Sequence, residues 1–518
     1  MADLLWWGVA PPIVIGLALS FALERLLQPS TVPFYQRPAA AVLIHVALWL
    51  LLFAIELALF RRPWFAAANV LALLLFIVLV SNAKFHALRE PFIFQDFEYF
   101  TDALKHPRLY LPFLGLGKAV IAALGFGAAL FAGLSLESSL LGRMAGVEFI
   151  MTLFLVLLVA ALLLWLGASK KLGLSLEPAT DLRQLGLMAS LWRYGEQDYA
   201  QHRVYSAYEN LQPAGVAAQA LPNLVVVQSE SFFDARELSA AIRPQVLHEF
   251  DAIKATAACH GKLRVPAWGA NTVRTEFAFL SGLAADALGV HRFNPYRKLA
   301  REGLASLASF LKSLGYRTVC VHPYPSSFYA RDTVLPSLGF DEFIDIRSFD
   351  GAAKTGPYVG DVVLAEKVCA LLAASSTQPI FVFVITMENH GPLHLEKVQE
   401  GDVERFYSSS ALAGCDDLTI YLRHLCNADR MAAMLRDQLH ALPRPACLCW
   451  FGDHVPIMPE VYATLGVPDG RTDYLIWTKG IEPSPAGRVD MRVEDLAALL
   501  LEKTRLVVKV RIPVQPDH

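Results

Sequence analysis

Long stretches of consecutive apolar residues fill the first third of the chain. Five of them, at positions 6–23, 39–60, 64–80, 119–136 and 147–167, approach the ~20 residues that a helix needs to cross a bilayer. The first stretch lacks the basic start of a cleaved signal peptide and is followed by further apolar stretches, so we expect it to be retained. The pattern predicts an all-α transmembrane bundle of five spans over residues 1–168.

The pattern changes twice after this bundle. Residues 169–221 are mixed in character and contain helical stretches, which is typical of a juxtamembrane connector. From residue 222 to 518, short apolar runs alternate with helical segments, as they do in chains built from strand–helix–strand units. We therefore predict a C-terminal α/β domain over residues 222–518, with a mostly parallel sheet sandwiched by helices.

Composition agrees with a membrane protein that also has a water-soluble part. Hydrophobic residues make up 55% of the chain and charged residues 18%, and the mean hydropathy of +0.40 is too high for a wholly soluble protein. The net charge of −3 gives no electrostatic reason to expect nucleic acid as a partner. The seven cysteines include no CxxC pair, so the sequence indicates neither a disulfide framework nor a zinc knuckle.

Two features of the apolar part leave alternatives open. Glu56, inside the second stretch, is either a functional carboxyl at membrane depth or a side chain that packs on another helix or reaches toward Arg61 and Arg62. An odd number of spans places the two ends of the chain on opposite sides of the membrane. The count of Lys and Arg in the connecting loops argues against an external C-terminal domain.

Four apolar runs in the second part of the chain stop at residues that can do chemistry. The runs cover residues 223–228, 317–321, 380–386 and 446–451. The residues that follow them are Glu230, His322, His390 and the pair Asp453 and His454. Because the carboxyl ends of parallel strands meet at one edge of a sheet, where α/β proteins bind their ligands, we expect these side chains to gather there. Each of them alone is more simply explained as a loop residue.

Glu230, Asp453 and His454 offer oxygen and nitrogen ligands without a thiolate, which suits Zn²⁺ or Mn²⁺. Thr272, at the predicted start of an amphipathic helix, is a candidate nucleophile. It is either an ordinary helix cap or a hydroxyl that loses its proton beside a divalent ion. In the second case, the free N–H groups of the helix start would stabilise a phosphoryl oxygen.

These motifs resemble those of the alkaline phosphatase/sulfatase superfamily, and specifically its lipoteichoic acid synthase-like branch. The matching segments are Ser229-Glu230-Ser231, Thr272 with Glu276-Phe277, Met387-Glu388-Asn389-His390 and Gly452-Asp453-His454. Five spans before an external catalytic domain extend the resemblance over nearly the whole chain. It implies that one divalent ion is held by Glu230, Thr272, Asp453 and His454. Mn²⁺ is the first candidate for this ion, and Zn²⁺ and Mg²⁺ are the alternatives. It also implies catalytic roles for Thr272, as nucleophile, and His390.

The segment 328–332 resembles the part of that family that grips a phosphoglycerol headgroup. The resemblance implies that Arg331 binds the phosphate, with His322 and Tyr329 beside it. The chain departs from the family pattern at Tyr329, where tryptophan is typical, and at Tyr324, where an acid is typical. These departures leave the headgroup and the acceptor open. The alternative for Arg331 is a surface ion pair with Asp332.

The resemblance implies a membrane-bound transferase. It would move phosphoglycerol from a phospholipid such as phosphatidylglycerol to a cell-envelope glycan or polymer, through a phosphothreonine intermediate. The catalytic domain would lie on the periplasmic or extracellular side of the plasma membrane, contrary to the charge count. Transfer of phosphoethanolamine, transfer of phosphoglycerol to a glucan, and hydrolysis are the alternatives. A sulfatase is disfavoured because Thr272 is not the modifiable Cys or Ser of that class, and a scaffold would not explain the strand ends.

Overall fold

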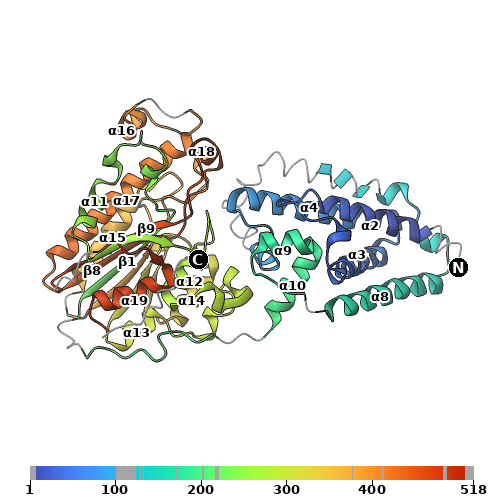
Figure 1. Ribbon diagram of the computed structural model, residues 1–518, viewed down its shortest axis with the longest axis horizontal. Helices are drawn as coiled ribbons and strands as arrows, with labels where there is room; N and C mark the ends of the chain where they lie inside the picture. The colour runs from blue at the N-terminus through green and yellow to red at the C-terminus, as the bar shows by residue number, and fades with distance from the viewer. Residues whose placement is uncertain are drawn as a thin grey trace. The chain divides into compact units, whose positions relative to one another are not determined.

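We describe the protein from a computed structural model of the 518-residue chain. The structure describes residues 8–100, 124–125, 127–128, 130–131, 133–170, 172–200, 204–215, 221–375, 377–409, 413–481 and 487–507. The chain divides into two compact units, Met1–Gln201 and His202–His518. Each unit is described by itself, and both can be followed in Figure 1.

The first unit is built from helices. They are α2 (Ala10–Glu24), η2 (Phe34–Gln36), α3 (Ala39–Phe60), α4 (Pro63–Leu88), η3 (Phe94–Glu98), η4 (Leu140–Gly142), α8 (Gly146–Ala168), α9 (Pro178–Leu185) and α10 (Leu187–Tyr199). Three of them, α3, α4 and α8, are long and apolar enough to cross a membrane, with window hydropathies of 2.5, 2.4 and 2.9.

The prediction of five spans is therefore not confirmed. The first predicted stretch forms α2, which at 15 residues is shorter than a full span. The fourth stretch, 119–136, lies mostly outside the described residues. Helices α9 and α10, which fall within the segment predicted as a connector, belong to the first unit, where Leu187 and Ala189 pack into its apolar clusters.

Buried charged groups in the first unit have partners. Glu24 is fully buried and forms ion pairs with Arg37 and His45. Its Oε1 also accepts hydrogen bonds from the backbone N–H groups of Leu187, at 2.9 Å, and Met188, at 3.2 Å. These are free N–H groups at the start of α10, so Glu24 fastens the end of α2 to α10 by capping that helix.

Glu56 has a structural partner as well. The Asn69 side-chain amide in α4 donates a hydrogen bond to Glu56 Oε2 in α3 at 3.0 Å. The contact agrees with the alternative in which Glu56 packs against a neighbouring helix.

The second unit contains a sheet of eight strands in the order β10-β2-β9-β8-β1-β7-β3-β4, and a separate hairpin of β5 and β6. The strands are β1 (Asn223–Ser229), β2 (Cys259–Arg264), β3 (Arg317–Val321), β4 (Glu342–Ile344), β5 (Lys354–Thr355), β6 (Tyr358–Val359), β7 (Ile380–Ile385), β8 (Ala446–Gly452), β9 (Thr472–Lys479) and β10 (Met491–Arg492). The sheet is mixed, because β9 runs antiparallel to both β8 and β2. The predicted parallel arrangement holds from β8 to β4.

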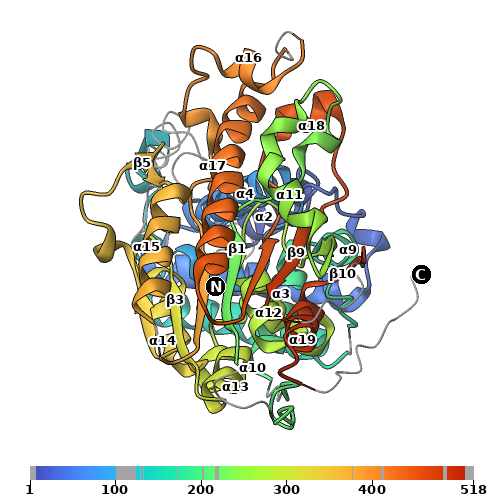
Figure 2. The ribbon, with the colours of Figure 1, turned by 90° about the vertical axis from the view of Figure 1, so that its left-hand side faces the viewer.

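Helices cover both faces of this sheet, as Figures 1 and 2 show. The helices of this unit are α11 (His248–Ala255), α12 (Thr272–Ser281), α13 (Leu307–Ser313), α14 (Arg331–Ser337), α15 (Asp361–Ala374), α16 (Asp402–Phe406), α17 (Asp416–Ala441), α18 (Pro459–Leu465) and α19 (Val493–Lys503). Short 3-10 turns are η6 (Ala235–Glu237), η7 (Pro244–Leu247), η8 (Ala285–Phe293), η9 (Ala300–Glu302), η10 (Phe328–Ala330), η11 (Ile346–Phe349) and η12 (Leu393–Leu395).

The strand residues alternate between two apolar cores. Val225 and Val227 of β1 pack into the core with α11, α15 and α17, whereas Leu224 and Val226 pack into the core with α12, α13, α14 and α19. Both faces are buried, which explains why the central strands read as continuous apolar runs. Because the helices cover both faces, a site for chemistry is expected at the edge of the sheet where the parallel strands end.

Candidate metal centre and active site

The four strands whose ends were singled out in the sequence lie next to one another. In the sheet, β8 pairs with β1, β1 with β7 and β7 with β3, and every one of these pairings is parallel. In the pairing of β1 with β8, Ser229 is opposite Gly452. Glu230 and Asp453 therefore follow directly after two paired strand ends, which brings them to the same point of the sheet edge.

Glu230, Asp453 and His454 form a buried cluster of potential metal ligands. One ligand atom from each lies within 4.8 Å of the others. His454 Nε2 is 3.5 Å from Glu230 Oε1 and 3.4 Å from Asp453 Oδ2. Within the described part of the chain, Asp453 Oδ2 and His454 Nε2 have no hydrogen-bond partner. Buried polar atoms normally have one, so these two point to a ligand that this pair is built to bind.

The electrostatics of the cluster also fit a cation. Burial, followed by the neighbouring charge of Asp453, raises the pKa of Glu230 to about 8. Two carboxylates this close disfavour each other's ionised form unless a positive charge lies between them. A carboxylate pair and an imidazole nitrogen are a ligand set for a divalent ion such as Zn²⁺ or Mn²⁺. The residues present therefore fit such an ion.

Tight turns after β1 and β8 position these ligands. At Gly452, a Cβ atom would lie 1.9 Å from the Phe232 carbonyl oxygen, so only glycine allows the two chain segments to approach this closely. Ser231 has a positive φ of 54°, and its N–H donates a 2.8 Å hydrogen bond to Asp453 Oδ1. The Glu230 N–H donates to Thr386 Oγ1 at 2.9 Å. The turn after β1 thus holds Asp453, and Thr386, directly after β7, holds Glu230.

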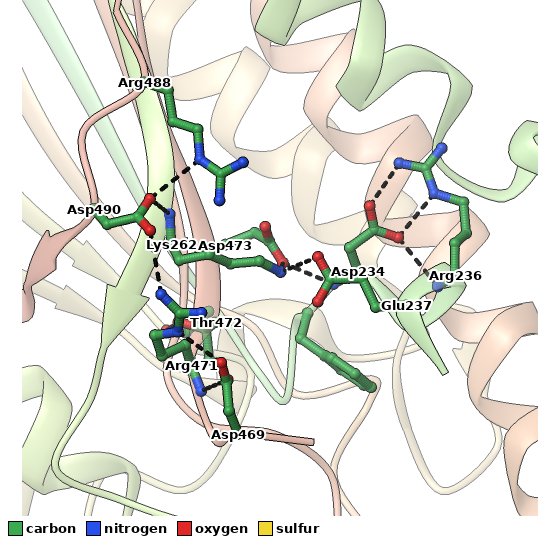
Figure 3. Close-up of polar contacts among 12 residues, drawn as sticks. Asp234, Arg236, Glu237, Lys262, Asp469, Arg471, Thr472, Asp473, Arg488 and Asp490 are labelled. Carbon is green, nitrogen blue, oxygen red and sulfur yellow. Dashed lines mark hydrogen bonds and ion pairs between the residues drawn. The ribbon is translucent and has the colours of Figure 1, made fainter. Parts of the chain in front are cut away.

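A charged network anchors the chain that follows Glu230 (Figure 3). The Asp234 N–H donates to Asp473 Oδ2 of β9 at 2.8 Å, and Lys262 Nζ of β2 donates to the same oxygen at 3.1 Å. Arg236 pairs with Asp234 and with Asp251 of α11. The loop is therefore tied to the antiparallel side of the sheet and to a covering helix.

Thr272 is the first residue of α12 and faces the cluster. Asn271, with a positive φ of 65°, occupies the N-cap position, so Thr272 is not the helix cap. Thr272 Oγ1 lies 3.5 Å from Glu230 Oε2. One turn later, the Thr275 hydroxyl donates to the Asp453 carbonyl at 2.8 Å, which fixes the helix against the strand end. The start of α12 is thus held beside all three ligands.

Arg331 is buried and does not form a surface ion pair with Asp332. Its guanidinium makes a two-pronged contact with Glu276 of α12, with Nη2 to Oε2 at 2.7 Å and Nε to Oε1 at 3.3 Å. The Tyr296 hydroxyl donates to Glu276 as well. Glu276 had appeared in the sequence only as part of the threonine motif, because its partner lies 55 residues away along the chain.

His322 and Tyr329 both lie beside Arg331. His322 Nδ1 is 3.0 Å from the Ile385 carbonyl oxygen, and Arg331 Nη1 is 3.2 Å from His322 Nε2. Burial and the charge of Arg331 lower the pKa of His322 well below its ordinary value. The Tyr329 ring centroid is 5.3 Å from Arg331 Cζ. The structure therefore brings together the three residues expected to bind the headgroup.

His390 lies near the cluster and has a neighbour that the sequence did not reveal. Its Nδ1 is 2.8 Å from the Gly391 carbonyl oxygen, so Nδ1 carries the proton and Nε2 keeps its lone pair. The Tyr358 hydroxyl, from strand β6, is 3.4 Å from the same Nδ1, and the two rings meet edge to face. Tyr358 was missed because a two-strand hairpin of two residues each gives no periodic signal.

A second acidic pair, Asp361 and Glu388, was also missed. Glu388 Oε2 accepts the Asp361 N–H at 2.6 Å, and Oε1 accepts the Asn427 amide at 2.6 Å. Both Asp361 carboxylate oxygens are buried without a hydrogen-bond partner among the described residues, and burial and Glu388 raise the pKa of Asp361 well above its ordinary value. In the sequence, Asp361 reads as an ordinary acid in the first turn of a helix.

The arrangement of strands, ligand cluster and threonine helix can be compared with known proteins. The family model described as Sulfatase matches residues 222–504. The chain belongs to the sulfatase family. The resemblance found in the sequence motifs is thereby confirmed, and the sulfatase-like domain coincides with the α/β unit.

Two relatives from Rhizobium meliloti (strain 1021) are similar in sequence. The capsular polysaccharide biosynthesis protein RkpI is 28% identical over 481 residues, which cover 88% of this chain and 85% of RkpI. A putative cyclic beta-1,2-glucan modification protein is 27% identical over 261 residues, covering 50% of this chain and 40% of that protein. The chain thus spans most of RkpI but less than half of the second relative.

Among solved structures, the integral membrane protein lipooligosaccharide phosphoethanolamine transferase A from Neisseria meningitidis is similar, with a TM-score of 0.52. The match covers 89% of this chain and 95% of that one at 12% sequence identity. At this low sequence identity, the match indicates a similar fold and nothing further. Its coverage takes in most of both units of the present chain.

Proposed function

We propose that the protein is a metal-dependent transferase that moves phosphoglycerol from a membrane phospholipid such as phosphatidylglycerol to a cell-envelope glycan. The observation that carries the proposal is the meeting of Thr272 with Glu230, Asp453 and His454 at the sheet edge. Membership of the sulfatase family and three apolar helices long enough to span a membrane support a phosphotransferase that works on lipid. The relatives named for capsular polysaccharide and glucan support a glycan acceptor.

In this proposal, Glu230, Asp453 and His454, with the Thr272 hydroxyl as a fourth ligand, hold one divalent ion, for which we propose Mn²⁺. The ion, when bound, lowers the pKa of a hydroxyl and neutralises charge on phosphate oxygens. The N–H groups at the start of α12 point toward a phosphoryl group next to Thr272 and add further stabilisation. Arg331, held in place by Glu276, binds the phosphate, and His322 and Tyr329 complete the headgroup site.

The reaction then proceeds in two displacements. Thr272 Oγ1 attacks phosphorus, the bond to the diacylglycerol oxygen breaks, and the threonine proton is transferred to the leaving oxygen. In the second step, an acceptor hydroxyl attacks the phosphothreonine, the bond to Thr272 breaks, and the acceptor's proton returns to Thr272. We assign these proton transfers to His390, because its free Nε2 can accept a proton and burial lowers its pKa, so that it is neutral at physiological pH.

The proposal is tested with purified protein, labelled phosphatidylglycerol vesicles and Mn²⁺. We expect diacylglycerol release by the natural protein and its loss in Thr272→Ala, by about 10³-fold or more. Thr272→Ser, which keeps a hydroxyl, should retain part of the activity and accumulate a phosphoglycerol adduct detectable by intact-protein mass spectrometry. Diacylglycerol release that persists in Thr272→Ala would show that Thr272 is not the nucleophile.

The same assay discriminates between donors and acceptors. Phosphatidylethanolamine in place of phosphatidylglycerol tests the phosphoethanolamine alternative, and a purified capsular polysaccharide or cyclic glucan tests the acceptor. If release needs an added glycan, the protein is a transferase; equal release in its absence would make it a hydrolase.

We place the catalytic unit on the periplasmic or extracellular side of the plasma membrane, because a cell-envelope glycan is found there. The count of Lys and Arg around the predicted spans argues for the opposite side. A reporter fused after His518 decides between the two: a reporter that is active only in the cytoplasm would overturn the placement.

A further inference from the structure

An apolar cavity of about 620 Å³, partly open to the surface, lies between helices of the first unit. Its walls come from α3, α4, η3 and α10, and among the described residues that line it only Glu196 carries a charge. A cavity of this volume falls within the range of about 300–1,000 Å³ that is usual for small-molecule sites.

The cavity is built by the fold and is not a gap between loosely associated helices. Leu187 of α10 packs with Leu74 and Val78 of α4, and Ala189 packs with Ala41 of α3. Glu24 fastens the start of α10 through two backbone hydrogen bonds. These contacts hold α10 against the two membrane-length helices α3 and α4.

The approach of η3 to α10 depends on a glycine. At Gly195, a Cβ atom would lie 2.9 Å from the Phe94 ring, so a larger residue would push η3 away. Phe94 and Gly195 both line the cavity. The glycine therefore lets η3 close one side of the cavity.

The position of the cavity along the bundle is set by the same contacts. Helix α10 packs on Ala41 near the start of α3 and on Leu74 and Val78 in the middle of α4. The C-terminal Gly167 of α8 touches Ile44 there as well. The lining residues of α3 and α4 fall at positions 48–52 and 70–77, near the middle of both helices, so the pocket reaches from α10 into the middle of the bundle.

The lining of the cavity determines what it can hold. It offers almost no polar surface, so a polar ligand would lose its hydrogen bonds with water and gain none in return. Trp192, Glu196 and Tyr199 of α10 are the lining residues with polar groups, and amphipathic side chains of this kind are typical of the membrane interface. The chemistry fits a long hydrocarbon chain whose polar end remains at the interface.

We propose that this cavity holds an acyl chain of the phospholipid donor, so that the donor is bound by its tail in the first unit before its headgroup reacts. The proposal rests on the proposed function for its choice of ligand. It assigns the first unit a substrate-binding role in addition to membrane anchoring.

A pair of variants on one helix tests the proposal. Leu73 lines the cavity and is 47% exposed, whereas Leu79, on the same helix, is 58% exposed and does not line it. We expect Leu73→Trp to raise the apparent KM for vesicle phosphatidylglycerol about fivefold or more, because it obstructs the acyl chain. Leu79→Trp should leave it unchanged. Turnover of a water-soluble phosphodiester, bis(p-nitrophenyl) phosphate, should be the same in both variants, which also shows that both are folded.

Photo-crosslinking provides a readout that does not depend on activity. Phosphatidylglycerol with a diazirine in its tail should label α3, α4 and α10 at cavity residues such as Leu51 and Leu191, and Leu73→Trp should reduce the labelling. Equal kinetics in the two tryptophan variants, or labelling spread evenly over the apolar helices, would overturn the cavity proposal. Soluble-ester turnover that is unaffected by Thr272→Ala would instead overturn the proposed function, whatever the labelling pattern.

Discussion

Two buried clusters of charged groups, one in each unit of this protein, are satisfied in opposite ways. In the first unit, the carboxylate of Glu24 is paired with Arg37 and His45 and also caps α10, so each of its oxygens has a partner. In the second unit, Asp453 Oδ2 and His454 Nε2 are equally buried but have no hydrogen-bond partner among the described residues.

The difference separates a structural polar cluster from a functional one. A satisfied network in a low-dielectric interior rigidifies the fold and leaves nothing free to bind. A buried polar network that lacks hydrogen-bond partners destabilises the fold. Such a network is retained where its free atoms bind a ligand or take part in a reaction. The two clusters therefore predict opposite outcomes when a buried acid of each is replaced by its amide.

The largest effect is expected for Asp453→Asn. The amide keeps the oxygen that accepts the Ser231 N–H but loses the negative charge, so transferase activity should fall on the order of 10³-fold. Because one of two repelling carboxyls is removed, the melting temperature of the metal-free protein should not decrease. Activity is measured by diacylglycerol release, and stability by differential scanning fluorimetry.

The control for this variant is Asp429→Asn. Asp429 is a buried acid of the same unit that accepts the N–H groups of Glu249 and Phe250. Asp429→Asn should change the melting temperature without changing the rate of diacylglycerol release. If Asp453→Asn melted at a much lower temperature than the natural protein and kept its activity, the interpretation of the unpaired cluster as functional would be wrong.

Glu24→Gln is expected to show the opposite behaviour. Breaking a buried ion pair leaves Arg37 uncompensated and typically costs about 3–5 kcal/mol, so the detergent-solubilised protein should unfold at a markedly lower temperature. Turnover of bis(p-nitrophenyl) phosphate measured well below that temperature should be close to normal. The exposed pair of Glu342 with Arg317 provides the comparison, since Glu342→Gln should cost only about 0–1 kcal/mol.

Asp361 extends the comparison between satisfied and unsatisfied buried acids. Its carboxylate has no hydrogen-bond partner among the described residues, although it lies outside the cluster of Glu230, Asp453 and His454. Its raised pKa means that the folded state keeps a proton that the unfolded chain releases at about pH 4. Its contribution to stability is therefore lost as the pH rises above about 4, toward its raised pKa in the folded protein. Asp361→Asn should flatten that pH dependence, and at pH 8 it should be more stable than the natural protein by about 1–2 kcal/mol.

Denaturant unfolding at pH 5 and pH 8 measures this difference. A variant with the same pH dependence as the natural protein would show that Asp361 is not the group responsible. A loss of activity in a variant that is stabilised would place Asp361 among the functional residues.

The smallest effect is expected for Tyr358→Phe. The ring and its packing on His390 are kept, but the hydroxyl 3.4 Å from Nδ1 is lost. We expect a fall in kcat/KM of about twofold to tenfold, together with a displaced limb of the pH–rate profile, because the environment of His390 changes. Tyr324→Phe, which alters the ring that meets Tyr358 edge to face, is the control. A normal pH profile in Tyr358→Phe would exclude a role in positioning His390.

The sequence by itself determined the apolar first third, the α/β second part and the four strand ends. Strands buried on both faces have to be continuously apolar, and a polar residue immediately after such a run marks the point where the strand leaves the core. Glu230, His322, Asp453 and His454 could be found in this way. Thr272 could be singled out only as one of two alternatives, because a threonine near a helix start is commonly a cap.

Tertiary structure alone decided which side chains touch. The contact of Glu276 with Arg331, the approach of Tyr358 to His390 and the reversed direction of β9 all join segments that are far apart along the chain. Local patterns record which face of a strand or helix is buried, but not its partner across the fold. For the same reason, no pattern in the chain predicts the cavity between α3, α4, η3 and α10, which exists only where four apolar surfaces meet without filling the space.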